Sequence, residues 1–161
     1  MKSIAGVVLF KALLCLLSFQ TANDCGSVPA KNKKIVAYMK TKIGKTVGEY
    51  CNDFFHEAYK AGGTTYHEVF GYPGLDFTKD CIYPGDMIIL KNVSIIGKRN
   101  GESTGIKYDN WQINYLIYKV ISRGVYEVVR TETIDKKDKV TLTEIDIDKF
   151  KGTKPQIYHP A

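Results

Sequence analysis

A single cysteine in the stretch GKTVGEYCNDFFHEAYKAGG, residues 44–63, stands where a glycine-containing loop gives way to a helical pattern. The first turn of a helix presents unsatisfied backbone amides and the positive end of the helix dipole, and both stabilise a thiolate. Cys51 is therefore a candidate nucleophile. The same position also suits half of a disulfide or a small apolar residue at a helix start, and such structural cysteines are the commoner case.

A cysteine nucleophile needs a base, and the chain contains three histidines. His56 follows Cys51 by five residues on the same predicted helix, so at ~100° per residue its side chain points about 140° away. His67 lies in a loop rich in glycine, proline, threonine and tyrosine, and His159 lies on the last predicted strand. These two are the alternative bases, although histidines of loops and strands usually have surface or packing roles.

The acidic residues near these positions have simpler explanations than catalysis. Glu49 and Asp53 lie in the first turn of the predicted helix, where the dipole favours acids. Asp86, in a Pro-Gly-Asp turn, is expected to close that turn with its side chain. The sequence contains no phosphate loop, paired metal-ligand motif or serine nucleophile elbow, so we expect neither a metal nor a cofactor.

The amino terminus predicts an export signal. Lys2 supplies the positive charge, residues 4–19 form an apolar run, and Thr21-Ala22 gives a cleavage site. A buried helix or a membrane anchor is the alternative, but the run is short for a membrane span, contains Lys11 and lies at the very start of the chain. We therefore predict a signal peptide over residues 1–22 and an extracellular mature chain without a membrane span.

The cysteine count of the mature chain predicts one disulfide and one free thiol. Cleavage removes Cys15 and leaves three cysteines, an odd number in an oxidising compartment. Cys25 lies in an irregular leader, residues 23–32, and Cys81 ends a loop, so these two are the natural partners. Cys51 would then stay reduced, although sequence alone does not establish connectivity.

The charge pattern of the chain is mildly basic. The formal net charge is +6, and lysines gather at residues 31–34, 40–45 and 136–139. These lysines could favour anionic surfaces or glycans, but solvated helix faces and a hairpin tip are the better explanation, because acids interleave with the lysines and no aromatic-basic pattern indicates a nucleic acid partner. Asn92, in Asn-Val-Ser, is the one potential N-glycosylation acceptor if the source is eukaryotic.

The order of the predicted elements indicates an α+β domain. Helical spacing of apolar residues predicts helices over 32–43 and 49–60. Segments rich in β-branched and aromatic residues predict strands at 87–90, 112–121, 124–134, 140–147 and 156–159. Turns are expected at 122–124 and 135–139, an exposed loop at 97–105 and a long ordered loop at 64–80. The antiparallel sheet is expected to pack on the second helix through Phe54, Phe55 and Ala58.

A family resemblance covers residues 33–160. In order, IGKTVGEYCNDFFHEAYKAGG, YPGDMIIL, NYLIYKVISRGVYEVVRTE and FKGTKPQIYHP resemble the papain-like fold of CHAP and NlpC-type cell-wall hydrolases. The most similar branch is the eukaryotic cysteine-proteinase fold also found in fungal actin-patch proteins. The resemblance implies a VGxxC helix start, a PGD turn leading into a core strand, and a later strand that begins with histidine. It implies thiolate attack on an amide, with that histidine as base and a third polar residue orienting it.

The chain departs from this pattern at the base. The position expected for the strand histidine corresponds to Asn114, within one residue. An asparagine amide can hydrogen-bond a thiolate, but it cannot accept and return a proton near neutral pH. The standard dyad is therefore incomplete.

Three functions follow from these residues. The first is a secreted papain-fold domain with impaired catalysis that acts as a binding or effector module for a peptide, glycan or protein. The second is an active cysteine peptidase or amidase that uses Cys51, with cell-wall peptides as one substrate class. The third is a structural secreted domain in which Cys51 forms an intermolecular disulfide. We rank them in this order, because the missing histidine counts against the second and the helix-start motif against the third.

Overall fold

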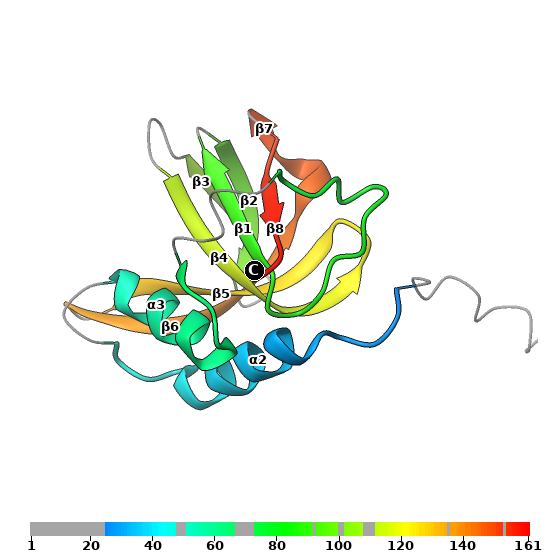
Figure 1. The fold of residues 1–161 in the computed structure, drawn as a ribbon. Coiled ribbons are helices and arrows are strands. Elements are labelled where there is room, and N and C mark those ends of the chain that lie inside the picture. Colours follow the sequence, from blue (N-terminus) through cyan, green and yellow to red (C-terminus); the bar gives the residue numbers. More distant parts are fainter. Residues whose placement is uncertain are drawn as a thin grey trace, which may run out of the picture.

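The computed structural model describes residues 25–47, 51–66, 73–91, 93–99, 102–107, 112–134, 136–152 and 154–161, without the side chains of 51–52, 93–107 and 151–152. Two helices come first, α2 (Ala30–Lys42) and α3 (Cys51–Gly62). The strands that follow are β1 (Met87–Lys91), β2 (Val93–Arg99), β3 (Glu102–Lys107), β4 (Gln112–Ser122), β5 (Val125–Ile134), β6 (Lys137–Asp146), β7 (Lys151–Gly152) and β8 (Gln156–Tyr158), with a short 3-10 helix at Ile147–Lys149. The predicted α+β class is confirmed (Figure 1).

The strands form an antiparallel sheet in the order β3-β2-β6-β5-β4-β1-β8, and β7 pairs with β2. The predicted pairing of the segments 112–121 and 125–134 is confirmed as β4 and β5. Register shifts within this pair, between Ile117 and Lys119 and between Val120 and Ser122, mark irregularities that increase the twist of the ribbon. Strand β1 lies between β4 and β8, so the C-terminal strand β8 ends this strand order beside β1 (Figure 1).

The apolar residues divide between the two faces of the sheet by their alternation along the strands. In β1, Met87 and Ile89 pack in the cluster that contains the helices, whereas Ile88 and Leu90 pack in a second cluster on the opposite face. Phe54, Phe55, Ala58 and Tyr59 of α3 join the first cluster, as do Ile35 and Met39 of α2. The predicted contact of the second helix with the sheet is confirmed, and β1 is apolar from Met87 to Leu90 because both of its faces are covered there.

The two helices pack side by side in opposite directions (Figure 1). Gly62, at the end of α3, lies so close to α2 that a Cβ there would meet Ile35 Cγ1 at 2.8 Å. Near the other end of α2, Lys42 pairs with Glu57 at 3.3 Å. The end of α3 therefore lies against the beginning of α2, and the beginning of α3 points the other way.

Two sequence predictions in the sheet are wrong. The expected exposed loop at 97–105 is part of a hairpin in which β2 and β3 pair from Ser94 to Arg99. Its glycine and charged residues carry no strand-like apolar pattern, but backbone pairing with a neighbouring strand does not require one. The turn expected at 135–139 is shorter, because β6 begins at Lys137 after Lys136, whose φ is 61°.

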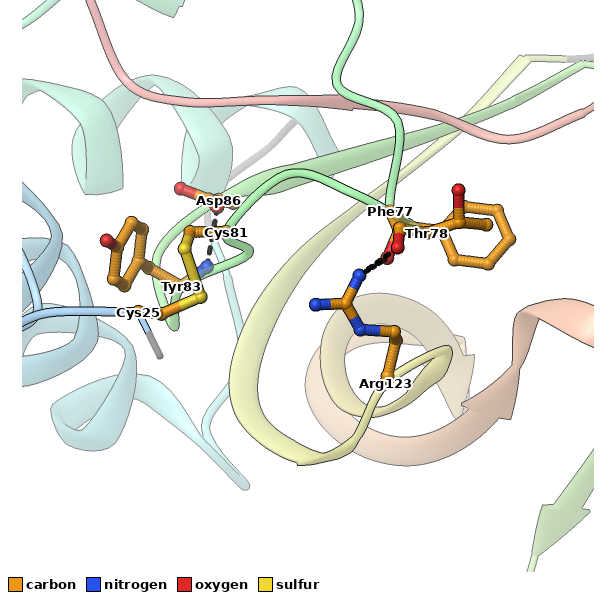
Figure 2. The surroundings of a disulfide bond; sticks show 7 residues. All are labelled: Cys25, Phe77, Thr78, Cys81, Tyr83, Asp86 and Arg123. Atoms are coloured by element: carbon orange, nitrogen blue, oxygen red, sulfur yellow. Dashed lines mark hydrogen bonds between the residues drawn. A yellow bond between two sulfur atoms is a disulfide. The ribbon is translucent and has the colours of Figure 1, made fainter. Parts of the chain in front are cut away.

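The predicted Cys25–Cys81 disulfide is present in the structure, with the two Cα atoms 5.4 Å apart (Figure 2). It joins the leader before α2 to the loop before β1. The same loop receives hydrogen bonds from Arg123 Nη1 to the carbonyl oxygens of Phe77 and Thr78. None of the helices that the structure describes has the length and apolar character needed to cross a bilayer.

Candidate functional site

The Pro-Gly-Asp turn before β1 is pressed against the first turn of α2. Gly85 has a φ of 92°, and a Cβ built on it would lie 2.9 Å from both the Cα and the carbonyl oxygen of Asn32. Only glycine combines that backbone conformation with so close an approach. The backbone of the turn also pairs with β4, because Gly85 N donates to Ile117 O at 2.7 Å and Ile117 N donates to Asp86 O at 2.9 Å.

Asp86 is a wholly buried carboxylate with three hydrogen-bond partners. Its Oδ2 accepts from the backbone amide of Tyr83 at 2.7 Å, which confirms the predicted closure of the turn (Figure 2). Its Oδ1 accepts from Asn32 Nδ2 at 2.7 Å and lies 2.9 Å from His159 Nδ1. We call these four residues, Asn32, Tyr83, Asp86 and His159, the Asp86 cluster.

The two titratable groups of the Asp86 cluster have shifted pKa values. Burial raises the pKa of Asp86, and hydrogen bonds from His159, Tyr83 and Asn32 oppose that rise. The hydrogen bond to Asp86 raises the pKa of His159, against a smaller opposing effect of burial. The side chain of His159 is 42% exposed, so the cluster joins a buried carboxylate to an imidazole that solvent can reach.

The Asp86 cluster lies toward the end of α3 that is remote from Cys51. Asn32 is in the first turn of α2, next to Lys31, whose carbonyl is close to Gly62 at the end of α3. Cys51 is the first residue of α3, as the helix-start prediction requires. At a rise of 1.5 Å per residue, the helix carries Cys51 about 16 Å from Gly62.

Asn114 lies in β4, opposite Ile89 of β1, and belongs to a second group of polar residues. Its Nδ2 donates to the hydroxyl of Tyr66, and its Oδ1 accepts from Gln112 Nε2 at 3.1 Å. Tyr66 contacts α3, with ring centroids 6.2 Å from Phe55 and 4.7 Å from His56. We call Tyr66, Gln112 and Asn114 the Asn114 cluster. Burial raises the pKa of the Tyr66 hydroxyl.

Tyr59 lies in the core, in contact with Tyr66 of the Asn114 cluster and within electrostatic range of Asp86. Its side chain is buried, and its hydroxyl has no hydrogen-bond partner among the atoms that the structure describes. Burial raises the pKa of Tyr59 well above its usual range, and the charges of Asp86 and Tyr66 act in the same direction. Its ring meets that of Tyr66 edge-on at 6.0 Å.

Three predicted residues lie outside what the structure describes: the side chain of Cys51, the loop residue His67 and the sequon residue Asn92. The predictions made for them stay predictions, as does the signal peptide over residues 1–22. Within the described residues, no group of three histidine, cysteine, aspartate or glutamate side chains is placed to hold a metal ion.

Sequence reasoning missed the roles of Asn32, Tyr66 and Tyr83. The interpretation of residues 31–34 as a solvated lysine face hid Asn32, which is buried. A signal was present, because Asn32, Ile35 and Met39 recur at helical spacing and therefore share the buried face of α2. Nothing in the loop sequence around Tyr66 indicates that its hydroxyl meets Asn114.

Comparison of the chain with protein-family models, with curated proteins and with solved structures found no match.

Proposed function

We propose that the chain is a secreted domain with a papain-like fold of the CHAP and NlpC type that binds a peptide, glycan or protein ligand without turning it over. The observation that carries this proposal is the engagement of Asn114 by Tyr66 and Gln112. Two amides and a phenol with a raised pKa cannot accept a proton from a thiol near neutral pH. The residues around the expected base position therefore suit hydrogen bonding to a ligand.

The placement of the other histidines supports the same conclusion. His159 is bound to Asp86 toward the end of α3 that is remote from Cys51. His56 contacts the ring of Tyr66, but it follows Cys51 by five helical positions and so projects about 140° away around α3. An active hydrolase would then depend on His67, the third histidine of the chain.

Secretion is supported by two features. The Cys25–Cys81 disulfide is of the kind that persists in oxidising compartments. Residues 1–22 have the charge, apolar run and cleavage site of a signal peptide. With Cys25 and Cys81 paired and Cys15 removed, Cys51 is the one thiol of the mature chain.

The test compares the wild type with Cys51→Ala and Asn114→His on peptide, amide and cell-wall substrates. We expect no Cys51-dependent turnover in the wild type. Turnover that appears in Asn114→His and disappears in a Cys51→Ala, Asn114→His double variant would show that the scaffold retains its nucleophile and lacks its base. The double variant is the matched control, because it keeps the introduced histidine.

Turnover by the wild type that is lost in Cys51→Ala would contradict the proposal. His67→Gln then asks whether His67 is the base, with His56→Gln as the control. Non-reducing gel electrophoresis of the mature chain tests the third function, a structural domain in which Cys51 forms an intermolecular disulfide. A disulfide-linked dimer that Cys51→Ala abolishes would assign Cys51 to an intermolecular bridge rather than to a ligand-binding domain.

A further inference from the structure

A pocket of about 340 Å³ lies beside His159. Among the residues that the structure describes, its lining includes Pro73, Leu75, Tyr158, His159 and Ala161. Small-molecule sites typically occupy about 300–1,000 Å³ and combine apolar walls with a few polar groups. Of the lining residues that the structure describes, His159 has the side chain that titrates near neutral pH, and the other four side chains are aliphatic or aromatic.

The walls of the pocket are fixed by the fold. Leu75 forms an isolated antiparallel bridge with Ile157, in which Leu75 N donates to Ile157 O at 2.8 Å. Tyr158 ends β8 and packs in the cluster between helices and sheet, with 7% of its surface exposed. The loop and the C-terminal strand therefore hold the two sides of the pocket together.

The orientation of His159 is also fixed. Its Nδ1 faces the Oδ1 of Asp86 at 2.9 Å, and Asp86 is itself immobilised by Asn32 and the Tyr83 amide. A carboxylate at Nδ1 keeps the proton of that nitrogen and leaves Nε2 as the nitrogen available to a ligand. Burying a carboxylate is costly, and such an arrangement is characteristic of functional imidazoles.

We propose that this pocket binds a small organic acid with an apolar body, whose carboxylate accepts a hydrogen bond from Nε2 of His159. Within the described lining the protonated imidazole supplies a positive charge, and a charge-assisted hydrogen bond is stronger than a neutral one. The apolar body would lie against Leu75, Pro73 and Tyr158.

The charged and titratable groups around His159 set the pH dependence of this binding. Asp86 acts from the turn before β1, and Asp80 acts from the preceding loop, and both raise the pKa of His159. Asp80 is exposed, so solvent and salt screen its repulsion of an anion. The ring of Tyr83 packs at 5.6 Å. Binding should therefore be strongest when His159 is protonated and should weaken as the pH rises through its raised pKa.

This site does not depend on the thiol. Hydrolysis by Cys51 would contradict the proposed function and leave the pocket and its ligand class in place. Conversely, a failure to bind carboxylates would remove this inference and leave the lack of turnover untouched.

The test is an NMR titration of the oxidised chain with phenylacetate and with isovalerate, followed at the His159 imidazole and the Leu75 methyl groups. Phenylacetamide is the matched neutral control ligand. We expect saturable shifts with the acids at about pH 6, where the imidazole is protonated, and about tenfold weaker binding of the amide. His159→Gln should weaken acid binding about tenfold and abolish its pH dependence. Lys34→Gln, which removes an exposed lysine on α2, should bind like the wild type.

Four results would overturn the proposal. They are equal binding of phenylacetate and phenylacetamide, unchanged acid binding in His159→Gln, shifts confined to residues outside the pocket, and no saturation by either acid up to about 20 mM. His159 is half-exposed, so its replacement should not unfold the chain, and the spectrum of the variant checks this directly.

Discussion

The Asp86 cluster and the Asn114 cluster lie along the same pair of strands but differ in chemistry. Ile117 of β4 bonds to Asp86, and Asn114 lies three residues earlier on that strand, about 10 Å away. One cluster holds a buried carboxylate and a histidine, whereas the other holds two amides and a phenol. His159 and Asp86, which could transfer a proton, lie toward the end of α3 that is remote from Cys51. This difference between the two clusters supports our functional proposal.

Loss of the Cys25–Cys81 disulfide, which tethers the loop leading to the Asp86 cluster, should reduce the free energy of unfolding the most. Replacement of both Cys25 and Cys81 by serine opens a crosslink between positions separated by 56 residues. The chain-entropy estimate for such a loop is a loss of about 4 kcal/mol in the free energy of unfolding. Denaturant titration measures this loss, and hydrogen exchange should show faster exchange of the Tyr83 amide than of amides in β4 near Asn114. Uniform acceleration in both regions would contradict a local anchoring role.

Removal of the Asp86 carboxylate should cause the second-largest loss of stability. Asp86→Ala leaves the Tyr83 amide and one amide proton of Asn32 without their acceptor in a buried turn. We expect the free energy of unfolding to fall by about 2–4 kcal/mol. Asp76→Ala in the exposed loop is the control; Asp76 also accepts a backbone hydrogen bond, from Thr78, but water can replace it there, so the loss should be clearly smaller than that of Asp86→Ala. Equal losses of unfolding free energy in the two variants would contradict this prediction, because the buried hydrogen bonds of Asp86 would then stabilise the fold no more than those of an exposed aspartate.

The Asn114 cluster should contribute less to the free energy of unfolding than the Asp86 cluster. Tyr66→Phe removes the hydroxyl that accepts from Asn114 and preserves the ring contacts with α3. A loss of about 1 kcal/mol is expected, because one half-buried neutral hydrogen bond is removed. A loss as large as that of Asp86→Ala would mean that the Asn114 cluster, rather than the Asp86 cluster, organises this part of the fold.

The pH dependence of stability should distinguish the clusters, because only the Asp86 cluster contains a histidine. Because the folded state raises the pKa of His159, its contribution to stability is complete below the pKa of an unfolded histidine and is lost as the pH rises through the folded value. The half-exposed imidazole is screened by water, so we expect a loss of no more than about 1 kcal/mol. Thermal unfolding followed from about pH 5 to pH 8 measures this loss, because that interval spans the ordinary pKa of histidine and the region above it. His159→Gln should flatten this part of the curve, whereas Tyr66→Phe should leave its shape unchanged.

The sequence predicted the fold class, a helix with Cys51 in its first turn and the disulfide, because these depend on local signals. Apolar residues of α3 recur at helical spacing, and the odd number of cysteines limited the pairing. The β2–β3 hairpin was missed because its pairing is set by neighbouring backbone rather than by an apolar pattern. The Asp86 cluster was only half predicted. The turn closure is local, but the contacts of Asp86 with Asn32 and His159 join residues 54 and 73 positions apart.

The separation of Cys51 from His159 can be tested through the reactivity of the thiol. The measurement is the pH profile of the rate at which iodoacetamide alkylates Cys51 in the oxidised chain, compared between the wild type and His159→Gln. A histidine paired with a thiol forms an ion pair that keeps the thiolate at low pH, so its removal raises the apparent pKa of the cysteine. Our account predicts the same apparent pKa in both proteins. A clear rise in His159→Gln would contradict it, because Cys51 and His159 would then act as a pair.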